Sequence, residues 1–305
     1  MNIEHLLAKA SHPNINVRAL QDLEAVASRY AAQANAPNTL RAYRADLQHC
    51  ASWCDRAGFH ALPTAPETIG RYLAAHATEY GTATLQRRLV AISRERKQAG
   101  QRLDTQHPAI RDTWKGIRRE RGTAQKGKAP LMGEDVRRIV GALPNTLQGH
   151  RDRALFLVGF ASAMRRSELA GLTVEDVAFT RHGLVIALHR SKTEQEGESR
   201  KVAVPCRAQA ATCPVRALRT WLDMAEIESG PLFRAVTRSD PARPSPLSDA
   251  SVAYVIKRAV TEAGLDPANY AGHSMRAGHA TSAAQADASE RKIMDQTGHK
   301  SERMV

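Results

Sequence analysis

The sequence has 305 residues, of which 42% are hydrophobic, 25% charged and 5% aromatic. This is an ordinary globular composition, long enough for two domains, with a core built mostly from aliphatic side chains. No apolar run approaches the roughly 20 residues that a membrane helix needs, and residues 1–10 lack the core of a signal peptide. These features exclude membrane-spanning and secreted classes, and we expect a cytoplasmic protein.

The four cysteines argue against a metal protein. Neither Cys50 with Cys54 nor Cys206 with Cys213 forms the C-x-x-C half of a zinc site, and no histidine pair stands at the matching spacing. We therefore expect reduced, partly buried thiols, no metal and no cofactor.

The charge of the chain indicates a polyanionic partner. The net charge is +13, and residues 1–130 carry 20 Lys/Arg against 11 Asp/Glu. Within that part, residues 87–128 alone carry 13 basic and 4 acidic side chains. So local an excess, in a segment that looks helical, favours nucleic-acid binding over an ordinary solvated face.

The first part of the chain is predicted to be helical throughout. The clearest helix is Pro37–Gly58, with Asn38 as N-cap, Gly58 as stop, and an apolar stripe at helical spacing formed by Leu40, Tyr43, Leu47, Cys50 and Cys54. A second helix begins at Pro66, a third near residue 82 or 84, and a fourth at Pro108.

The third and fourth predicted helices combine an inward apolar stripe with cations on their other faces. In the third, the outward cations are Arg87, Arg88, Arg94 and Lys97. In the fourth, they are Arg111, Lys115, Arg118 and Arg119.

Residues 122–130, with the sequence GTAQKGKAP, are short, polar and punctuated by Gly and Pro, as a linker is. We predict a helical DNA-binding domain over 15–122, a linker over 123–130 and a second domain over 131–305. In the second domain we predict strands at 183–189 and 201–205, and helices at 134–143, 151–163, 214–227, 248–264, 276–286 and 289–297. The fold class is therefore mostly α with a small β-sheet.

Three motifs of the second domain, with one lysine between the first two, stand out. They are Arg165-x-x-Glu168-Leu169, Lys192 in a predicted hairpin turn, His273-x-x-Arg276, and Gly298-His299. The spacing selects Arg165, and not Arg166, as the arginine of the first motif.

This ordered set resembles the boxes of the tyrosine recombinases of the phage integrase family. The resemblance covers roughly residues 18–305 and implies an N-terminal helical core-binding (SAM-like) domain followed by a tyrosine-recombinase catalytic domain. It also implies a site-specific recombinase or integrase that breaks and rejoins DNA through a 3′-phosphotyrosyl intermediate, without ATP or a divalent metal. The implied partners are a double-stranded DNA recombination site and, on paired sites, three further copies in a homo-tetramer.

The resemblance assigns phosphate binding to Arg165 and Arg276. Tyrosine attack on a phosphodiester builds negative charge on the non-bridging oxygens, and two forked guanidiniums stabilise that charge. Glu168 is expected to orient the basic cluster. Outside the motif, Arg165 would be read as a helix-end arginine paired with Glu168.

Three further residues receive catalytic roles from the resemblance. His273 accepts the tyrosine proton and later returns it, because imidazole titrates near neutral pH. Lys192 is the general acid for the departing 5′-hydroxyl, and His299 donates a hydrogen bond to the scissile phosphate. The alternatives are a solvated loop lysine for Lys192 and a helix C-terminal stop for Gly298-His299. The predicted phosphate contacts elsewhere are Arg41, Arg44, Arg87, Arg88, Arg94, Lys126 and Lys128.

The nucleophilic tyrosine of the family stands two to three helical turns after the Gly-His box. Only residues 300–305 follow that box here, and none of the six tyrosines occupies the position. Tyr270 precedes the box and does not fit. We therefore expect that residues 1–305 are a truncated chain that binds DNA without cleaving it.

Two other classes remain as alternatives. A non-catalytic architectural or regulatory DNA-binding relative would keep the scaffold, but it would not need two arginines and a histidine directed at one phosphate. A helix-turn-helix repressor would explain the basic helices and leave the second domain without a role.

Overall fold

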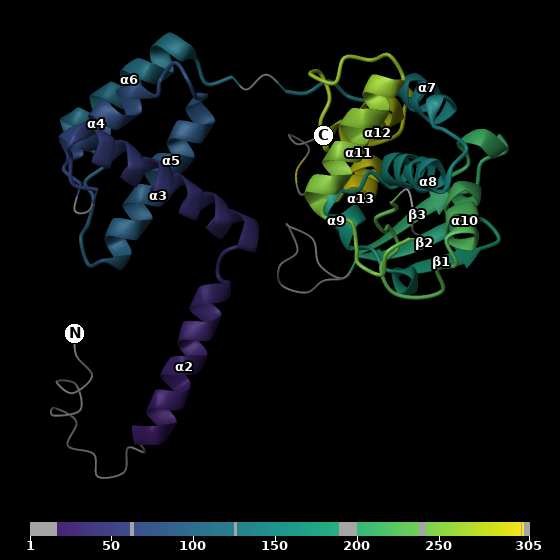
Figure 1. Cartoon of the computed structure of the whole chain (residues 1–305), viewed down its shortest axis with the longest axis horizontal. Coiled ribbons are helices and arrows are strands. Elements are labelled where there is room, and N and C mark those ends of the chain that lie inside the picture. The colour runs from purple at the N-terminus through teal and green to yellow at the C-terminus, as the bar shows by residue number, and fades with distance from the viewer. Residues whose placement is uncertain are drawn as a thin grey trace. The chain divides into compact units, whose positions relative to one another are not determined.

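The computed structural model describes residues 17–61, 64–124, 127–188, 200–237, 242–299 and 301. The chain separates into two compact units, Met1–Lys126 and Gly127–Val305 (Figure 1). The described helices of the first unit are α2 (Val17–Gln33), α3 (Pro37–Ala57), α4 (Pro66–Ala75), α5 (Thr82–Gln98) and α6 (Pro108–Arg121).

Helix α3 follows the sequence pattern closely at its end and less closely at its start. Gly58 adopts a left-handed conformation with φ of 71° and ends the helix, as predicted. The predicted N-cap is wrong: the cap is Ala36, without a side-chain bond, and Asn38 lies inside the first turn. Pro37 explains the difference, because proline favours the first helical position, which places the cap at residue 36, two residues before Asn38.

The core of the first unit is formed where α3 packs on α5 and α4 packs on α6. Ile69, Tyr72 and Leu85 are fully buried there. Gly70 permits the close approach of α4 to α6, since a Cβ at this position would lie 2.3 Å from the carbonyl oxygen of Ala109. In contrast, the described side chains of α2, from residue 22 to residue 30, are all exposed.

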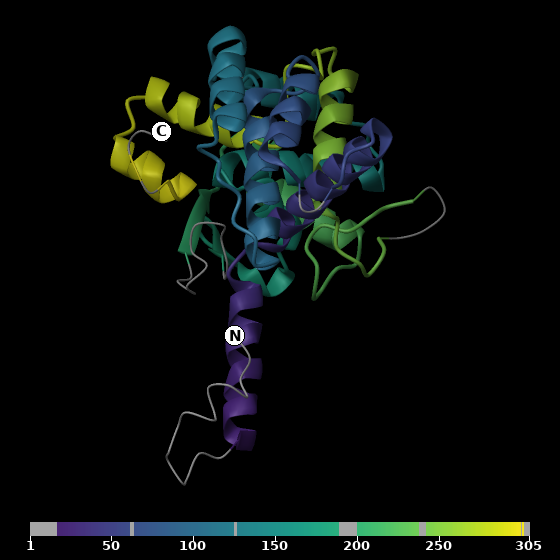
Figure 2. The ribbon, with the colours of Figure 1, turned by 90° about the vertical axis from the view of Figure 1, so that its left-hand side faces the viewer.

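The second unit consists of helices and a small sheet. Its described helices are α7 (Gly133–Ala142), α8 (Leu147–Ser162), α9 (Arg166–Gly171), α10 (Pro214–Met224), α11 (Asp249–Glu262), α12 (Ser274–Gln285) and α13 (Glu290–Thr297), with short 3-10 turns at Val174–Asp176 and Ala210–Thr212. Helices α8 and α10 pack against the strand β3 (Arg200–Pro205). Figure 2 shows α12 and α13, in yellow, joined by a short connection. The predicted class, mostly α with a small sheet, is confirmed.

The sheet has three described strands, β1 (Val177–Thr180), β2 (Gly183–Leu188) and β3 (Arg200–Pro205), in the order β1-β2-β3. Both pairings are antiparallel, and in the second Ile186 faces Val202. Strands β2 and β3 were predicted, but β1 was not. Most of β1 is exposed, so it lacks the apolar alternation that marks a half-buried strand.

Helix α8 is the centre of the second unit and carries the site at its C-terminal end. It is buried on nearly all sides, as its apolar sequence predicts, and α7, α10 and α12 pack against it. It begins at Leu147, four residues before the predicted start, because Thr146 caps it with a hydroxyl that accepts from Gly149 N at 3.2 Å.

Among the described residues, no helix has the length and apolar character to cross a membrane. All four cysteines are free thiols; Cys50, Cys54 and Cys213 are buried and Cys206 is exposed.

Candidate active site

Arg165 is held in place by Glu168. Helix α8 ends at Ala163 in a left-handed conformation with φ of 52°, which turns the chain so that Arg165 becomes the N-cap of α9. The carboxylate of Glu168 accepts from Arg165 N at 2.8 Å and from Arg165 Nη1 at 2.6 Å. The two side chains are 12% and 3% exposed, so this is an ion pair largely removed from water.

Arg276 reaches the same place from α12. Its Nη1 donates to the carbonyl oxygen of Ala163 at 2.8 Å, which fixes the guanidinium at the end of α8. Burial, and then the charge of Arg165, lower the pKa of Arg276 to about 10, while Glu168 opposes the shift. Arg276 therefore stays charged at neutral pH. Its Nη2 is buried and has no hydrogen-bond partner among the described residues, so it is a donor available to an anion.

His299 follows the last turn of α13. Thr297 ends the helix, Gly298 turns the chain with φ of 68°, and His299 Nδ1 lies 3.1 Å from Thr297 Oγ1. Burial lowers the pKa of His299, and the charges of Arg276, Arg165 and Arg200 lower it further. His299 is therefore neutral at pH 7 in the free protein, and it lies in the field of three guanidiniums.

Three other residues of the second unit were considered in the sequence: His273, Lys192 and Tyr270. His273 is the exposed residue at the start of α12, one helical turn before Arg276. Lys192 lies outside the described residues. Tyr270 is half-buried against the core, and burial raises its pKa.

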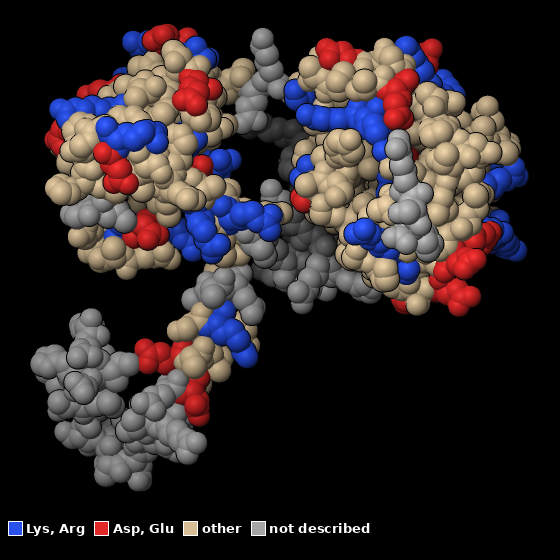
Figure 3. All heavy atoms as spheres, viewed as in Figure 1, with Lys and Arg blue, Asp and Glu red and all other residues tan. Residues whose placement is uncertain are grey.

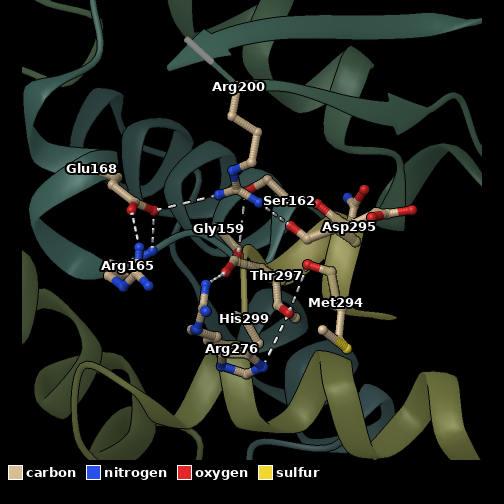
Figure 4. Close-up of polar contacts among 12 residues, drawn as sticks. Gly159, Ser162, Arg165, Glu168, Arg200, Arg276, Met294, Asp295, Thr297 and His299 are labelled. Carbon is tan, nitrogen blue, oxygen red and sulfur yellow. Dashed lines mark hydrogen bonds and ion pairs between the residues drawn. The ribbon is translucent and has the colours of Figure 1, made fainter. Parts of the chain in front are cut away.

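The structure thus brings Arg165, Glu168, Arg276 and His299 together from three separate parts of the chain. In Figure 4 they form one cluster, with Glu168 and Arg200 above Arg165, Arg276 and His299 in that view. Arg200 was not a predicted site residue. An arginine at the start of a strand carries no motif, so only the fold reveals its position.

Among the predicted phosphate contacts of the first unit, Arg88 differs from its predicted orientation. It was expected to point outward, but it is 5% exposed. Its Cζ lies 3.9 Å from the ring centroid of Tyr80, and its Nε lies 3.6 Å from an oxygen of buried Asp46. A buried carboxylate needs counter-ions, and both Arg87 and Arg88 supply positive charge to Asp46, so the predicted outward orientation of Arg88 is wrong.

The remaining predicted contacts have different surroundings. Arg41 and Arg44 are exposed on α3. Arg87 is half-exposed and binds both carboxylate oxygens of Asp46, at 2.7 and 3.0 Å. Arg94 is half-buried, with its Cζ 5.7 Å from the ring of Tyr43.

The last two predicted phosphate contacts are Lys126 and Lys128, in the predicted linker. Lys128, in the second unit, is exposed and donates to the carbonyl of Ala268 at 2.6 Å. Lys126 lies outside the described residues.

The first unit also contains a groove between α5 and α6 with a volume of about 1100 Å³. Its cationic lining consists of Arg94, Lys97, Arg111, Lys115, Arg118 and Arg119. Leu89, Val90 and Trp114 also line it, so cations border an apolar surface. Elsewhere, on the face shown in Figure 3, Lys and Arg form separate patches with acidic side chains between them.

Comparisons with known proteins identify the family of the chain. The model of the phage integrase family matches residues 130–305, more than half of the sequence. The chain therefore belongs to the phage integrase family, that is, to the tyrosine recombinases.

The chain is 42% identical over 298 residues to an integrase/recombinase XerD homologue of Selenomonas ruminantium, across 96% of this chain and 87% of that relative. Among solved structures it is similar to the Tn1549 transposon integrase in complex with transposon right-end DNA, with a TM-score of 0.62, 14% identity and 91% of both chains covered. It is also similar to a lambda integrase tetramer bound to a Holliday junction, with a TM-score of 0.58, 17% identity, and 99% and 86% of the two chains covered. At these identities the solved structures show the fold alone.

Proposed function

We propose that the protein is a site-specific DNA recombinase in which Arg165 and Arg276 bind the scissile phosphate. The observation that supports this proposal is the buried guanidinium of Arg276 beside Arg165, with Nη2 still lacking a hydrogen-bond partner among the described residues. Burying two cations close together is costly, and an anion between them offsets that cost. A DNA phosphate is the anion that the family acts on.

The proposed reaction is a transesterification in two halves. A tyrosine oxygen attacks the phosphorus and loses its proton to His273, while the bond from phosphorus to the 5′-oxygen breaks. Lys192 supplies the proton that the 5′-oxygen takes up, and His299 donates a hydrogen bond to the phosphate. The phosphotyrosyl ester conserves one phosphoester bond, so the reverse attack by a 5′-hydroxyl rejoins DNA without an external energy source.

In the ground state, charge stabilisation depends on the two arginines more than on His299. Neutral imidazole contributes a hydrogen bond but no charge, and the lowered pKa of His299 keeps it neutral at pH 7. A phosphate between the arginines would raise that pKa again, because it compensates the positive charges that lower it.

We also propose that the groove between α5 and α6 binds the DNA backbone, together with Arg41 and Arg44. DNA affinity is then expected to fall about a thousandfold between roughly 50 and 200 mM salt, as for a protein that contacts six phosphates. Fluorescence anisotropy with a labelled duplex measures this dependence. Lys115→Gln should reduce the slope of log K against log salt by about 1, and Lys257→Gln, an exposed lysine on α11, should leave it unchanged. An affinity independent of salt would contradict the proposal.

The recombination reaction is tested by trapping the covalent intermediate. The protein is expressed from its whole open reading frame and incubated with genomic DNA of its source. Covalent complexes are then precipitated with potassium and dodecyl sulfate, and both the DNA and the modified peptide are sequenced. We expect a 3′-phosphotyrosyl adduct at a defined DNA sequence. DNA that is bound at defined sites but never covalently attached would instead identify a non-catalytic regulatory or architectural relative.

We further propose that the full-length protein acts as a homo-tetramer on paired DNA sites. Support comes from the lambda integrase neighbour, which was solved as a tetramer on a Holliday junction. Mass photometry of the protein with a synthetic four-way junction carrying the trapped sequence would count the copies.

A further inference from the structure

Arg200, the first residue of β3, joins the strand to the end of α13. Its Nη1 donates to the carbonyl oxygens of Asp295 and Gln296, at 3.1 and 2.8 Å. These carbonyls belong to the last turn of the helix, where no backbone donor is available within the helix. A cation at a helix C-terminus is also favoured by the helix dipole.

The guanidinium of Arg200 also lies against Gly298, the residue that precedes His299. A Cβ on Gly298 would lie 2.8 Å from Arg200 Cζ, which is closer than real Cβ contacts allow. Gly298 also has a φ of 68°, a conformation that favours glycine, and a Cβ there would have to displace the Arg200 guanidinium. The guanidinium of Arg200 therefore lies directly against the turn that leads to His299.

On its other side Arg200 reaches Glu168. Its Nη2 lies 3.9 Å from Glu168 Oε2, the oxygen that also accepts from Arg165 N. Arg200 is 13% exposed and Glu168 is 3% exposed, so water screens this contact weakly. One carboxylate thus lies between the arginine that we propose binds phosphate and the arginine that holds α13, as Figure 4 shows.

A second set of hydrogen bonds, made by Gln296, also holds the end of α13 against α8 and β3. Gln296 Nε2 donates to the carbonyl oxygens of Ala161 and Ala203, at 2.9 and 3.1 Å. It joins α13 to α8 and β3 through neutral hydrogen bonds, whereas Arg200 adds the charge. The helix should therefore remain docked when Arg200 is replaced, although its last turn should shift.

We infer that Arg200 is a positioning residue, which fixes the end of α13, and with it His299, against Glu168. This inference rests on the proposed function, because it makes Arg200 act on the phosphate through His299. Arg200 does not itself reach the phosphate through Nη1, since that donor is used by the two carbonyls.

The test compares Arg200→Met, which keeps the length of the side chain, with Arg200→Lys, which keeps the charge. Lys201→Met is the matched control, because Lys201 is the next residue of the same strand and is exposed. Two quantities are measured: the rate of covalent adduct formation, and the pKa of His299 from the NMR titration of its ring, assigned by loss of the signal in His299→Gln.

In Arg200→Met we expect adduct formation to slow by about 100-fold, because a shift of about 1 Å at a reacting centre has that effect. The pKa of His299 should rise toward its ordinary value, because one of the cations that lower it has been removed. Arg200→Lys should keep the low pKa and fall between wild type and Arg200→Met in rate. Lys201→Met should match wild type in both measurements.

Either a wild-type rate or an unchanged pKa of His299 in Arg200→Met would overturn the inference. An arginine with no influence on His299 would lower thermal stability without moving the titration of that histidine, and the adduct rate then tests whether Arg200 also positions it. If Arg200→Met does not fold, Arg200→Lys decides, and a wild-type rate in that variant overturns the inference. If wild type itself forms no adduct, the proposed function has failed, and the titration alone then decides whether Arg200 sets the surroundings of His299.

Discussion

Replacing Arg276 with Met is expected to slow covalent adduct formation by about 100- to 1000-fold, as the loss of one charge-stabilising donor does in other active sites. The neutral side chain removes both the cation and the buried Nη2 donor, which lacks a partner among the described residues. The Ala163 carbonyl also loses its hydrogen bond. DNA affinity should change little, because most phosphate contacts are proposed to lie in the first unit.

Adduct formation and DNA affinity must be measured on the same preparations, so that a loss of binding is separated from a loss of chemistry. Arg291→Met is the matched control, since Arg291 is exposed on α13. Arg276→Lys should recover little activity, because an ammonium lacks the planar fork that donates to a carbonyl and a phosphate together. An adduct rate within about threefold of wild type in Arg276→Met would remove Arg276 from the proposed mechanism.

Replacing Glu168 with Ala should lower the free energy of unfolding of the second unit by about 3–5 kcal/mol, the range for breaking a buried ion pair from one side. Glu168 is the carboxylate that Arg165 and Arg200 share, and it also opposes the lowering of the pKa of Arg276. Without it, several buried guanidiniums repel one another with no anion between them.

Hydrogen exchange across a urea titration, read by mass spectrometry from peptides of the second unit alone, measures this loss. Glu290→Ala, at an exposed position in the first turn of α13, is the control and should cost at most about 0.5 kcal/mol. Glu168→Gln should fall between them, because it keeps the acceptor oxygen and loses the charge. A change below about 1 kcal/mol in Glu168→Ala would mean that water reaches the arginines and compensates them.

Much of this fold is predictable because residues that are close in sequence determine where its helices begin and end and which faces are buried. Proline starts predict α3 and α4, a glycine stop predicts the end of α3, and the apolar sequence of α8 predicts its central position. The resemblance to the tyrosine recombinases singles out Arg165, Arg276 and His299 in the sequence, since each belongs to a short motif of that family.

The features that were missed depend on partners distant in the sequence. Arg88 looks like an outward cation on its helix, but Asp46, buried on another helix, draws it inward. Arg200 acquires its position from carbonyls about ninety residues later in the chain. Strand β1 lacks a pattern because its ladder with β2, and not burial, holds it in place.

The acceptors that orient two of the arginines are main-chain atoms. Arg276 is held by the carbonyl of Ala163, and Arg200 by that of Asp295, so no side-chain substitution at those two positions removes the acceptor. During evolutionary drift, residue 163 is limited chiefly by its left-handed backbone and residue 295 hardly at all. Mutational tolerance near the site should therefore be uneven: broad at the exposed residue Asp295, and narrow at buried Ala163 and at Glu168 and Gly298.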